Sequence, residues 1–183
     1  MDLFVVSNSK AIPSTHALLI KPFKTIWEED DDPAKGEAIK AFTFIELSCS
    51  PKKSNPYVGY DEEERHRILK KQLYGDETYR LPGLVVDGII KYEELLENAS
   101  PTFPLLRDAL AASKKFRDQL ASMDLKERTN GGTAVYKPKD ISSAFKDLPE
   151  MAKTIENLLE KVHQELLAET KTRNNREIGP FEE

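Results

Sequence analysis

Two Glu-x-x-His motifs are the residues of this chain best suited to chemistry. One joins Glu63 to His66, and the other joins Glu160 to His163. Residues three apart lie on the same side of a helix, so both side chains of a motif can reach one metal ion. In four-helix bundles, two such motifs and two further glutamates hold a pair of metal ions. A di-iron site is therefore the first chemistry that this sequence suggests.

Helix geometry argues against this metal site. The apolar stripe of the helix that carries Glu160 contains Ile155, Val162 and Leu166. At about 100° per residue, Glu160 lies roughly 140° from the centre of that stripe. By the same count, Glu63 lies more than about 100° from the apolar face of its own helix. Ligands of a bundle site must point inward, so we expect both motifs to face solvent, with no metal and no cofactor bound.

Nucleophilic catalysis has equally weak support. Cys49 is the only cysteine, and it falls on the apolar side of a predicted helix, near its C-terminal end. A helix C-terminus raises the pKa of a thiol, whereas a nucleophile needs a lowered one. His16 has no partner acid that the sequence can place, and the chain lacks a Walker loop, a dinucleotide-type glycine fingerprint and a G-x-S-x-G elbow. We therefore predict a core role for Cys49 and no enzymatic activity.

The charged residues suggest exposed surface more than a nucleic-acid site. Residues 28–32 are five acidic residues in a row, which predicts a solvated loop, with cation binding as the alternative. The net charge of −5 opposes attraction of the whole domain to nucleic acid. The best basic candidates share no predicted helix and have no aromatic platform beside them. They are Lys137, Lys139, Lys171, Arg173 and Arg176.

The last thirteen residues, 171–183, differ from the rest of the chain because they have no apolar periodicity. They combine cations, hydrogen-bonding amides and two isolated apolar residues around a Gly-Pro bend. Such a segment buries too little alone to offset its chain entropy, so we expect it to be extended and to dock on a partner. A solvated tail without a role is the alternative. The predicted partner-binding residues are Lys171, Arg173, Asn174, Arg176, Ile178, Pro180 and Phe181.

The helix before this segment must position it. Apolar residues recur along 148–167 at spacings of three and four, which places them on one stripe of an α-helix. Pro149 fits the first turn, where its missing N–H would be unpaired in any case. We expect this helix to span 149–170 and to pack its stripe against another element.

The same periodicity predicts further helices and their ends. Asp32 and Pro33 suit the N-cap and first position of one helix, and Asp61 with Glu64 forms a capping box for the next, which Gly75 ends. Short helices are expected over 21–29 and after residue 137. Between the second and third helices, the irregular segment 50–60 is either a packed connection or a partner contact. The five substantial helices are expected over 33–49, 62–74, 82–98, 101–123 and 149–170.

Strand signals are few. Two short apolar runs in residues 1–20 predict an extended or β-hairpin arm, and the turn at 130–132 predicts a short strand over 133–136. The expected fold is therefore mainly α, a helical bundle with these two additions. Its parts are an N-terminal arm over 1–20, a helical core domain over 21–170 and a docking tail over 171–183.

Length and composition agree with one soluble domain. The chain has 183 residues, of which 39% are hydrophobic and 32% charged, enough for a core and much polar surface. One cysteine excludes an intrachain disulfide, which fits a reducing compartment. The N-terminus lacks the pattern of a signal peptide, and no apolar run approaches the roughly 18 residues of a membrane span. We expect no membrane association.

Three stretches of the sequence suggest a family. They are FIELSCSPKKSNPYVGYDEEERHRILKKQLYGDE, ERTNGGTAVYKPKDISSAFKDL and ETKTRNNREIGPFE, at residues 44–77, 127–148 and 169–182. In this order they resemble a virion structural protein of crAss-like tailed bacteriophages, over nearly the whole chain. None of the three is a catalytic signature.

The resemblance implies a place in the virion. A small, mainly helical protein with a C-terminal tail fits a head–tail connector, or adaptor, ring below the portal, whose C-terminal segments reach the portal protein. The ring would be twelvefold, like the portal, and would also contact other connector or tail proteins. DNA would pass through it without specific binding. The protein would be made in the cytoplasm of the bacterial host and reside in the neck, at the portal vertex.

Three other interpretations remain open. The chain could be another component of the same virion, either internal cargo or a tail-hub protein. It could instead be a helical regulatory binding module, or an enzyme with an unrecognised site. For a ring, the thin apolar face of 61–74 and the edge of residues 3–20 are the candidate contacts between subunits, and the N-terminal strands could extend a sheet of a neighbour.

Overall fold

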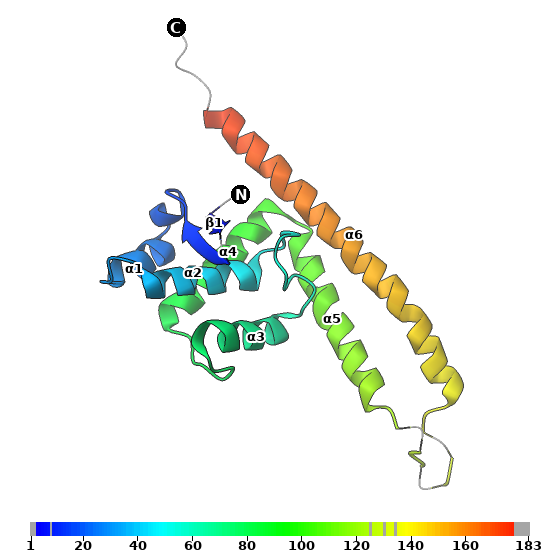
Figure 1. The fold of residues 1–183 in the computed structure, drawn as a ribbon. Coiled ribbons are helices and arrows are strands. Elements are labelled where there is room, and N and C mark those ends of the chain that lie inside the picture. Colours follow the sequence, from blue (N-terminus) through cyan, green and yellow to red (C-terminus); the bar gives the residue numbers. More distant parts are fainter. Residues whose placement is uncertain (1–2, 8, 125, 130, 134, 178–183) are drawn as a thin grey trace.

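The computed structural model describes residues 3–7, 9–124, 126–129, 131–133 and 135–177, without the side chains of residues 140 and 173–177. The chain is mainly helical with a short N-terminal β-hairpin, as predicted (Figure 1). The elements are β1 (Phe4–Ser7), β2 (Lys10–Pro13), a 3₁₀ turn (Ala17–Leu19), α1 (Lys21–Glu29), α2 (Gly36–Cys49), α3 (Glu62–Tyr74), α4 (Gly83–Ala99), α5 (Phe103–Ser122) and α6 (Pro138–Glu177).

Helix α2 lies at the centre of the core. Phe42, Phe44 and Ile45 are completely buried, although they point to different sides of the helix. The sequence predicted one apolar face that included Phe42, Ile45 and Cys49, and all three are buried. The opposite side is buried too, because the hairpin, α1, α3 and α4 all pack on α2. A helix that is covered on every side forms the inner layer of a domain.

The N-terminal hairpin belongs to this core. Strands β1 and β2 pair antiparallel, with Phe4 opposite Pro13 and Val6 opposite Ala11. The two apolar runs behind the hairpin prediction are residues 3–6 and 17–20; the second strand instead lies between them, and Ala17–Leu19 forms the 3₁₀ turn. The ring of Phe4 packs at 5.3–5.5 Å from those of three other aromatic residues, and the N–H of Ala11 donates to Thr43 Oγ1 of α2 at 2.9 Å. The hairpin therefore packs on α2. In the described part of the chain, neither outer edge of this two-stranded sheet has a neighbouring strand.

The start of α2 differs from the prediction. The helix begins at Gly36, after Lys35 in the left-handed region with φ of 53°, and not at Pro33. Asp30 provides the capping carboxylate, because its Oδ2 accepts from the N–H of Ala38 at 2.8 Å. Asp32 instead accepts from the N–H of Ala34 within the loop. The acidic stretch thus folds back over the helix start, and a cap from eight residues upstream has no local sequence signal.

Helix α3 matches the prediction at both ends. Asp61 Oδ1 accepts from the backbone N–H groups of Glu63 and Glu64, at 3.1 and 3.3 Å. Gly75, with φ of 79°, takes the left-handed conformation that ends the helix. Both signals are local, which is why the sequence locates them accurately.

Helix α6 is longer than predicted at both ends. It runs unbroken through Pro149, which lies in its interior and not in its first turn. Proline there removes one intrahelical hydrogen bond and crowds the preceding turn, but the strong helix formers on either side carry the helix across it. The helix also continues through Glu177, seven residues beyond the expected end at Thr170. The apolar periodicity ends near residue 167, and this point marks where the helix stops burying side chains. It does not mark the end of the helix itself.

Helices α5 and α6 form a long antiparallel hairpin that extends beyond the core (Figure 1). Residues 123–137 connect them. The predicted strand over 133–136 is not a regular strand among the described residues. Two backbone hydrogen bonds nevertheless join the two sides of the loop: Thr129 N–H to Thr133 O at 2.8 Å and Val135 N–H to Glu127 O at 3.1 Å.

Candidate partner-binding surfaces

The first Glu-x-x-His motif lies on α3. The side chain of Glu63 is 86% exposed and forms an ion pair with Lys114 of α5 at 2.8 Å. His66 packs on Phe44, with ring centroids 5.2 Å apart. Burial lowers the pKa of His66. The histidine is thus an aromatic packing residue, and the glutamate links α3 to α5.

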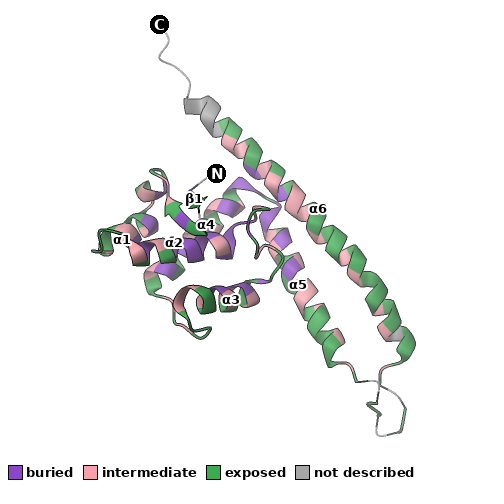
Figure 2. Cartoon of the chain, in the orientation of Figure 1, coloured by how far each residue is buried: buried purple, intermediate pink, exposed green. Residues whose placement is uncertain are grey.

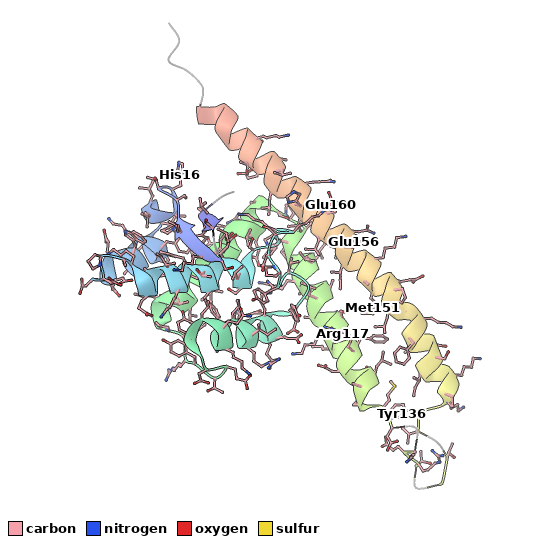
Figure 3. The ribbon with its side chains drawn as sticks, viewed as in Figure 1. His16, Arg117, Tyr136, Met151, Glu156 and Glu160 are labelled. Atoms are coloured by element: carbon pink, nitrogen blue, oxygen red, sulfur yellow. The ribbon has the colours of Figure 1, made fainter. Side chains whose placement is uncertain are left out.

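The second motif lies on α6, where Figure 3 labels Glu160. Glu160 forms an ion pair with Lys53 at 2.5 Å. The hydrogen bond and the charge of Lys53 lower the pKa of Glu160. The two motifs therefore use their carboxylates to tie α3 and α6 to other elements. Across the described residues, no three His, Cys, Asp or Glu side chains gather into a group that could hold a metal ion.

Cys49 lies inside the core at the end of α2. Burial raises the pKa of its thiol, and the nearby Ser48 Oγ, at 3.4 Å, lowers it only in part. A thiol held protonated in this way is a poor nucleophile.

Arg65 is a structural residue that the sequence analysis did not identify. It is buried on α3 and donates to the backbone carbonyls of Ser48, Val58 and Tyr60. Asn55 adds hydrogen bonds to the carbonyls of Leu47 and Ser50. Segment 50–60 is therefore a packed connection, held by side chains that satisfy its carbonyls. An arginine among glutamates and lysines on a charged helix gave no signal of burial.

The predicted partner-binding residues fall at and beyond the end of α6. Lys171 is exposed on the helix. Arg173, Asn174 and Arg176 belong to the last turns of α6, which corrects the expectation of an extended segment, and their side chains lie outside the described part. Ile178, Pro180 and Phe181 lie outside the described residues altogether.

The α5–α6 hairpin supplies a second candidate surface. We define the arm as residues 111–161, the part of α5 after Leu110 and of α6 before Val162. No described residue of the arm is buried (Figure 2). Two helices alone can cover only one side of each other, so their facing apolar residues stay partly open to solvent. The half-buried apolar side chains are Phe116, Leu120, Met123, Ile141, Ala144, Leu148, Met151, Ile155, Leu158 and Leu159.

The arm is fixed firmly at its base. Glu165 accepts hydrogen bonds from Ser100 Oγ at 2.6 Å, from the N–H of Thr102 at 3.1 Å and from Thr102 Oγ1 at 2.7 Å. Burial raises the pKa of Glu165, but these hydrogen bonds outweigh burial, and the pKa lies below its usual value. Val162 and Leu166 are buried beside this network. The arm thus leaves the core in a set direction.

Large apolar side chains are exposed on the arm. Phe145 is 58% exposed on α6, and Val135, in the connecting loop, is 40% exposed. A helical hairpin with a half-open apolar seam is a candidate surface for packing against another protein.

No described helix is long and apolar enough to cross a bilayer. In the comparisons with known proteins, no family model, curated protein or solved structure matches the chain.

Proposed function

We propose that this chain is a non-enzymatic virion structural protein that forms a ring at the portal vertex and connects the phage head to the tail. The resemblance of residues 44–77, 127–148 and 169–182 to crAss-like phage virion proteins supports the family. The physical character of the molecule supports the class, because its exposed features are surfaces for assembly.

One observation carries the proposal: none of the described residues of the arm is buried. Ten half-buried apolar side chains along 111–161 lose only part of their contact with water in the single chain. Covering an apolar side chain fully is worth roughly 1.5–3 kcal/mol. Covering a seam of this length with another protein would therefore contribute favourable binding free energy that the single chain does not gain.

In this proposal the C-terminal segment attaches the ring to the portal protein. Ile178 and Phe181 would occupy a groove of the portal, for roughly 1.5–3 kcal/mol each. Lys171, Arg173 and Arg176 would meet acidic groups at the groove rim and so set encounter rate and register. Asn174 and Pro180 would add a hydrogen-bonding group and a fixed bend.

The ring would close through head-to-tail contacts and match the twelvefold symmetry of the portal. Its other neighbours would be connector or tail proteins, and DNA would pass through without specific contacts. The chain would be made in the host cytoplasm and end in the neck of the virion.

The test is attachment to the portal. Purified chain should bind a portal ring, and deleting residues 171–183 should abolish binding. The double variant Ile178→Ala, Phe181→Ala should weaken attachment without changing the melting temperature, whereas the matched control Glu182→Ala, Glu183→Ala should attach normally.

Normal attachment of the double variant would rule out the docking role. A particle reconstruction with a single copy, or with copies spread over the shell, would rule out the ring and favour the alternative virion components, internal cargo or a tail hub. Regulation of another protein by the free chain would instead favour a binding module.

A further inference from the structure

A groove with negatively charged walls opens between α1, the start of α2 and the α3–α4 connection. We call it the acidic groove. Its apolar lining includes Ile26, Ala41 and Val85, and Tyr74 and Tyr79 line it as well. The two tyrosine rings stack in parallel, with centroids 4.1 Å apart and planes 9° apart. The groove therefore offers apolar and aromatic contact to anything that enters it.

Carboxylates also line the groove, and no cation is among its lining residues. Its acidic residues are Glu29, Asp30, Asp31 and Glu37. Asp30 is fixed as the cap of α2, and the hydrogen bond from Ala38 lowers its pKa, so it stays ionised. Glu37 forms an ion pair with Lys40 at 2.7 Å. Within the described chain, Glu29 and Asp31 form no ion pair, so their charges face solvent unpaired.

The chemistry of this groove defines its occupant. An arginine or lysine side chain can pair with Glu29 and Asp31 while its alkyl stem, or a guanidinium face, lies on the tyrosines and the apolar lining. The occupant must be a basic segment that protrudes from its own protein.

The end of α6 has these properties. Residues 171–176 contain Lys171, Arg173 and Arg176 and no acidic residue. Among the α6 residues whose side chains are described, Leu166 is the last buried one, and Lys171 and Thr172 are exposed, so this part of the helix extends past the core. In Figure 1 this end of α6 extends beyond the core and lies apart from α1, beside which the groove opens. The basic end of one chain is therefore placed to reach the groove of another.

We infer that the basic end of α6 of one copy binds the acidic groove of a second copy. The contact is heterologous, because the two surfaces differ, and repeating it joins copies head to tail into a ring or a filament. It requires no portal and does not depend on the proposed place in the virion. In a copy whose α6 end occupies a groove, Lys171, Arg173 and Arg176 are not available to the portal rim, and the portal contact of that copy rests on residues 178–183 alone.

Charge reversal in the full chain tests this contact by sedimentation at low and high salt. Wild-type protein should self-associate at low salt and dissociate as salt screens the charges. Glu29→Lys with Asp31→Lys should weaken association by about tenfold or more, and so should Lys171→Glu with Arg173→Glu. Mixing the two double variants should restore association, because each then offers the other a complementary surface.

Lys10→Glu with Lys21→Glu is the control matched in charge to the α6 reversal, since both side chains are exposed and neither lines the groove; it should associate like wild type. Circular dichroism of each variant checks that the fold is retained. A wild-type chain that stays monomeric at low salt overturns the inference. Association that persists in the Glu29→Lys, Asp31→Lys variant also overturns it. So does association that persists in the Lys171→Glu, Arg173→Glu variant but is lost in a Lys115→Glu, Arg117→Glu variant of the arm. Portal attachment is measured separately, so failure here leaves the proposed function standing.

Discussion

The core around α2 and the arm of α5 and α6 use apolar residues in opposite ways. In the core, Phe42 and Phe44 are fully buried by elements of the same chain. In the arm, Phe116 is half-buried and Phe145 is mostly exposed, although the arm has a comparable supply of apolar side chains. The core therefore contributes most of the apolar burial of the fold, whereas the arm leaves apolar side chains in contact with water.

The largest expected effect separates these two roles directly. Phe42→Ala should lower the free energy of unfolding by about 3–5 kcal/mol, because it empties a filled site. Phe145→Ala, the matched change in the arm, should alter it by no more than about 0.5 kcal/mol. Denaturant unfolding of both variants measures the difference. Equal losses would show that the arm is part of the folding core.

A second pair sharpens the comparison within one helix. A Cβ added at Gly88 of α4 would lie 2.7 Å from Cδ1 of Ile45, whereas one at Gly83 meets nothing within 4 Å. Gly88→Ala should destabilise by about 1–3 kcal/mol through overpacking against a buried side chain. Gly83→Ala should be close to neutral. The melting temperatures of both variants measure the difference. An unchanged melting temperature for Gly88→Ala would contradict the prediction that the core has no room for one more methyl group.

The sequence predicted elements with local signals and missed those that depend on distant contacts. It located α1 and α3 to the residue, because Pro22, Asp61 and Gly75 act on their own turns. It misplaced the start of α2, where the cap comes from Asp30, and it broke α6 at Pro149. Each miss reflects a preference that other parts of the chain override.

Burial in the candidate surfaces was harder to predict than the helices. The stripes of α5 and α6 indicated apolar faces, but periodicity cannot reveal that only two helices would share them. The seven predicted contact residues stand at the end of α6 or beyond the described chain, and the acidic stretch 28–32 gave no hint of the tyrosines that line the same groove. These arrangements depend on tertiary packing, which a single sequence does not encode locally.

A smaller effect concerns the joint between the two regions. The pKa of Glu165 lies below its usual value, so its hydrogen bonds to Ser100 and Thr102 stabilise the fold above that value and are lost as the pH falls through the lowered pKa. Glu165→Gln should weaken the joint already at neutral pH. Hydrogen exchange should then quicken in α6 near the joint and leave α2 unchanged. Faster exchange in α2 would mean that the arm is coupled to the core.

The smallest effect on global unfolding is expected at Pro149. Pro149→Ala restores an N–H within α6 and removes a steric conflict worth about 3 kcal/mol in a helix interior. Because the arm lies outside the core, the gain should appear as slower hydrogen exchange along residues 141–155, with little change in melting temperature. Unchanged exchange would show that the helix already accommodates the proline at no cost.

The buried position of Cys49 makes its thiol a probe of core opening, because it can react only when the core opens. A maleimide reacts with thiolate, and the only natural thiol is both covered and held protonated. A cysteine introduced at Val135 could therefore carry a single fluorophore while Cys49 stays intact. In unlabelled protein, the rate at which maleimide labels Cys49 would measure how often the core around α2 opens. That rate can be compared between protein with a free arm and protein with an occupied arm.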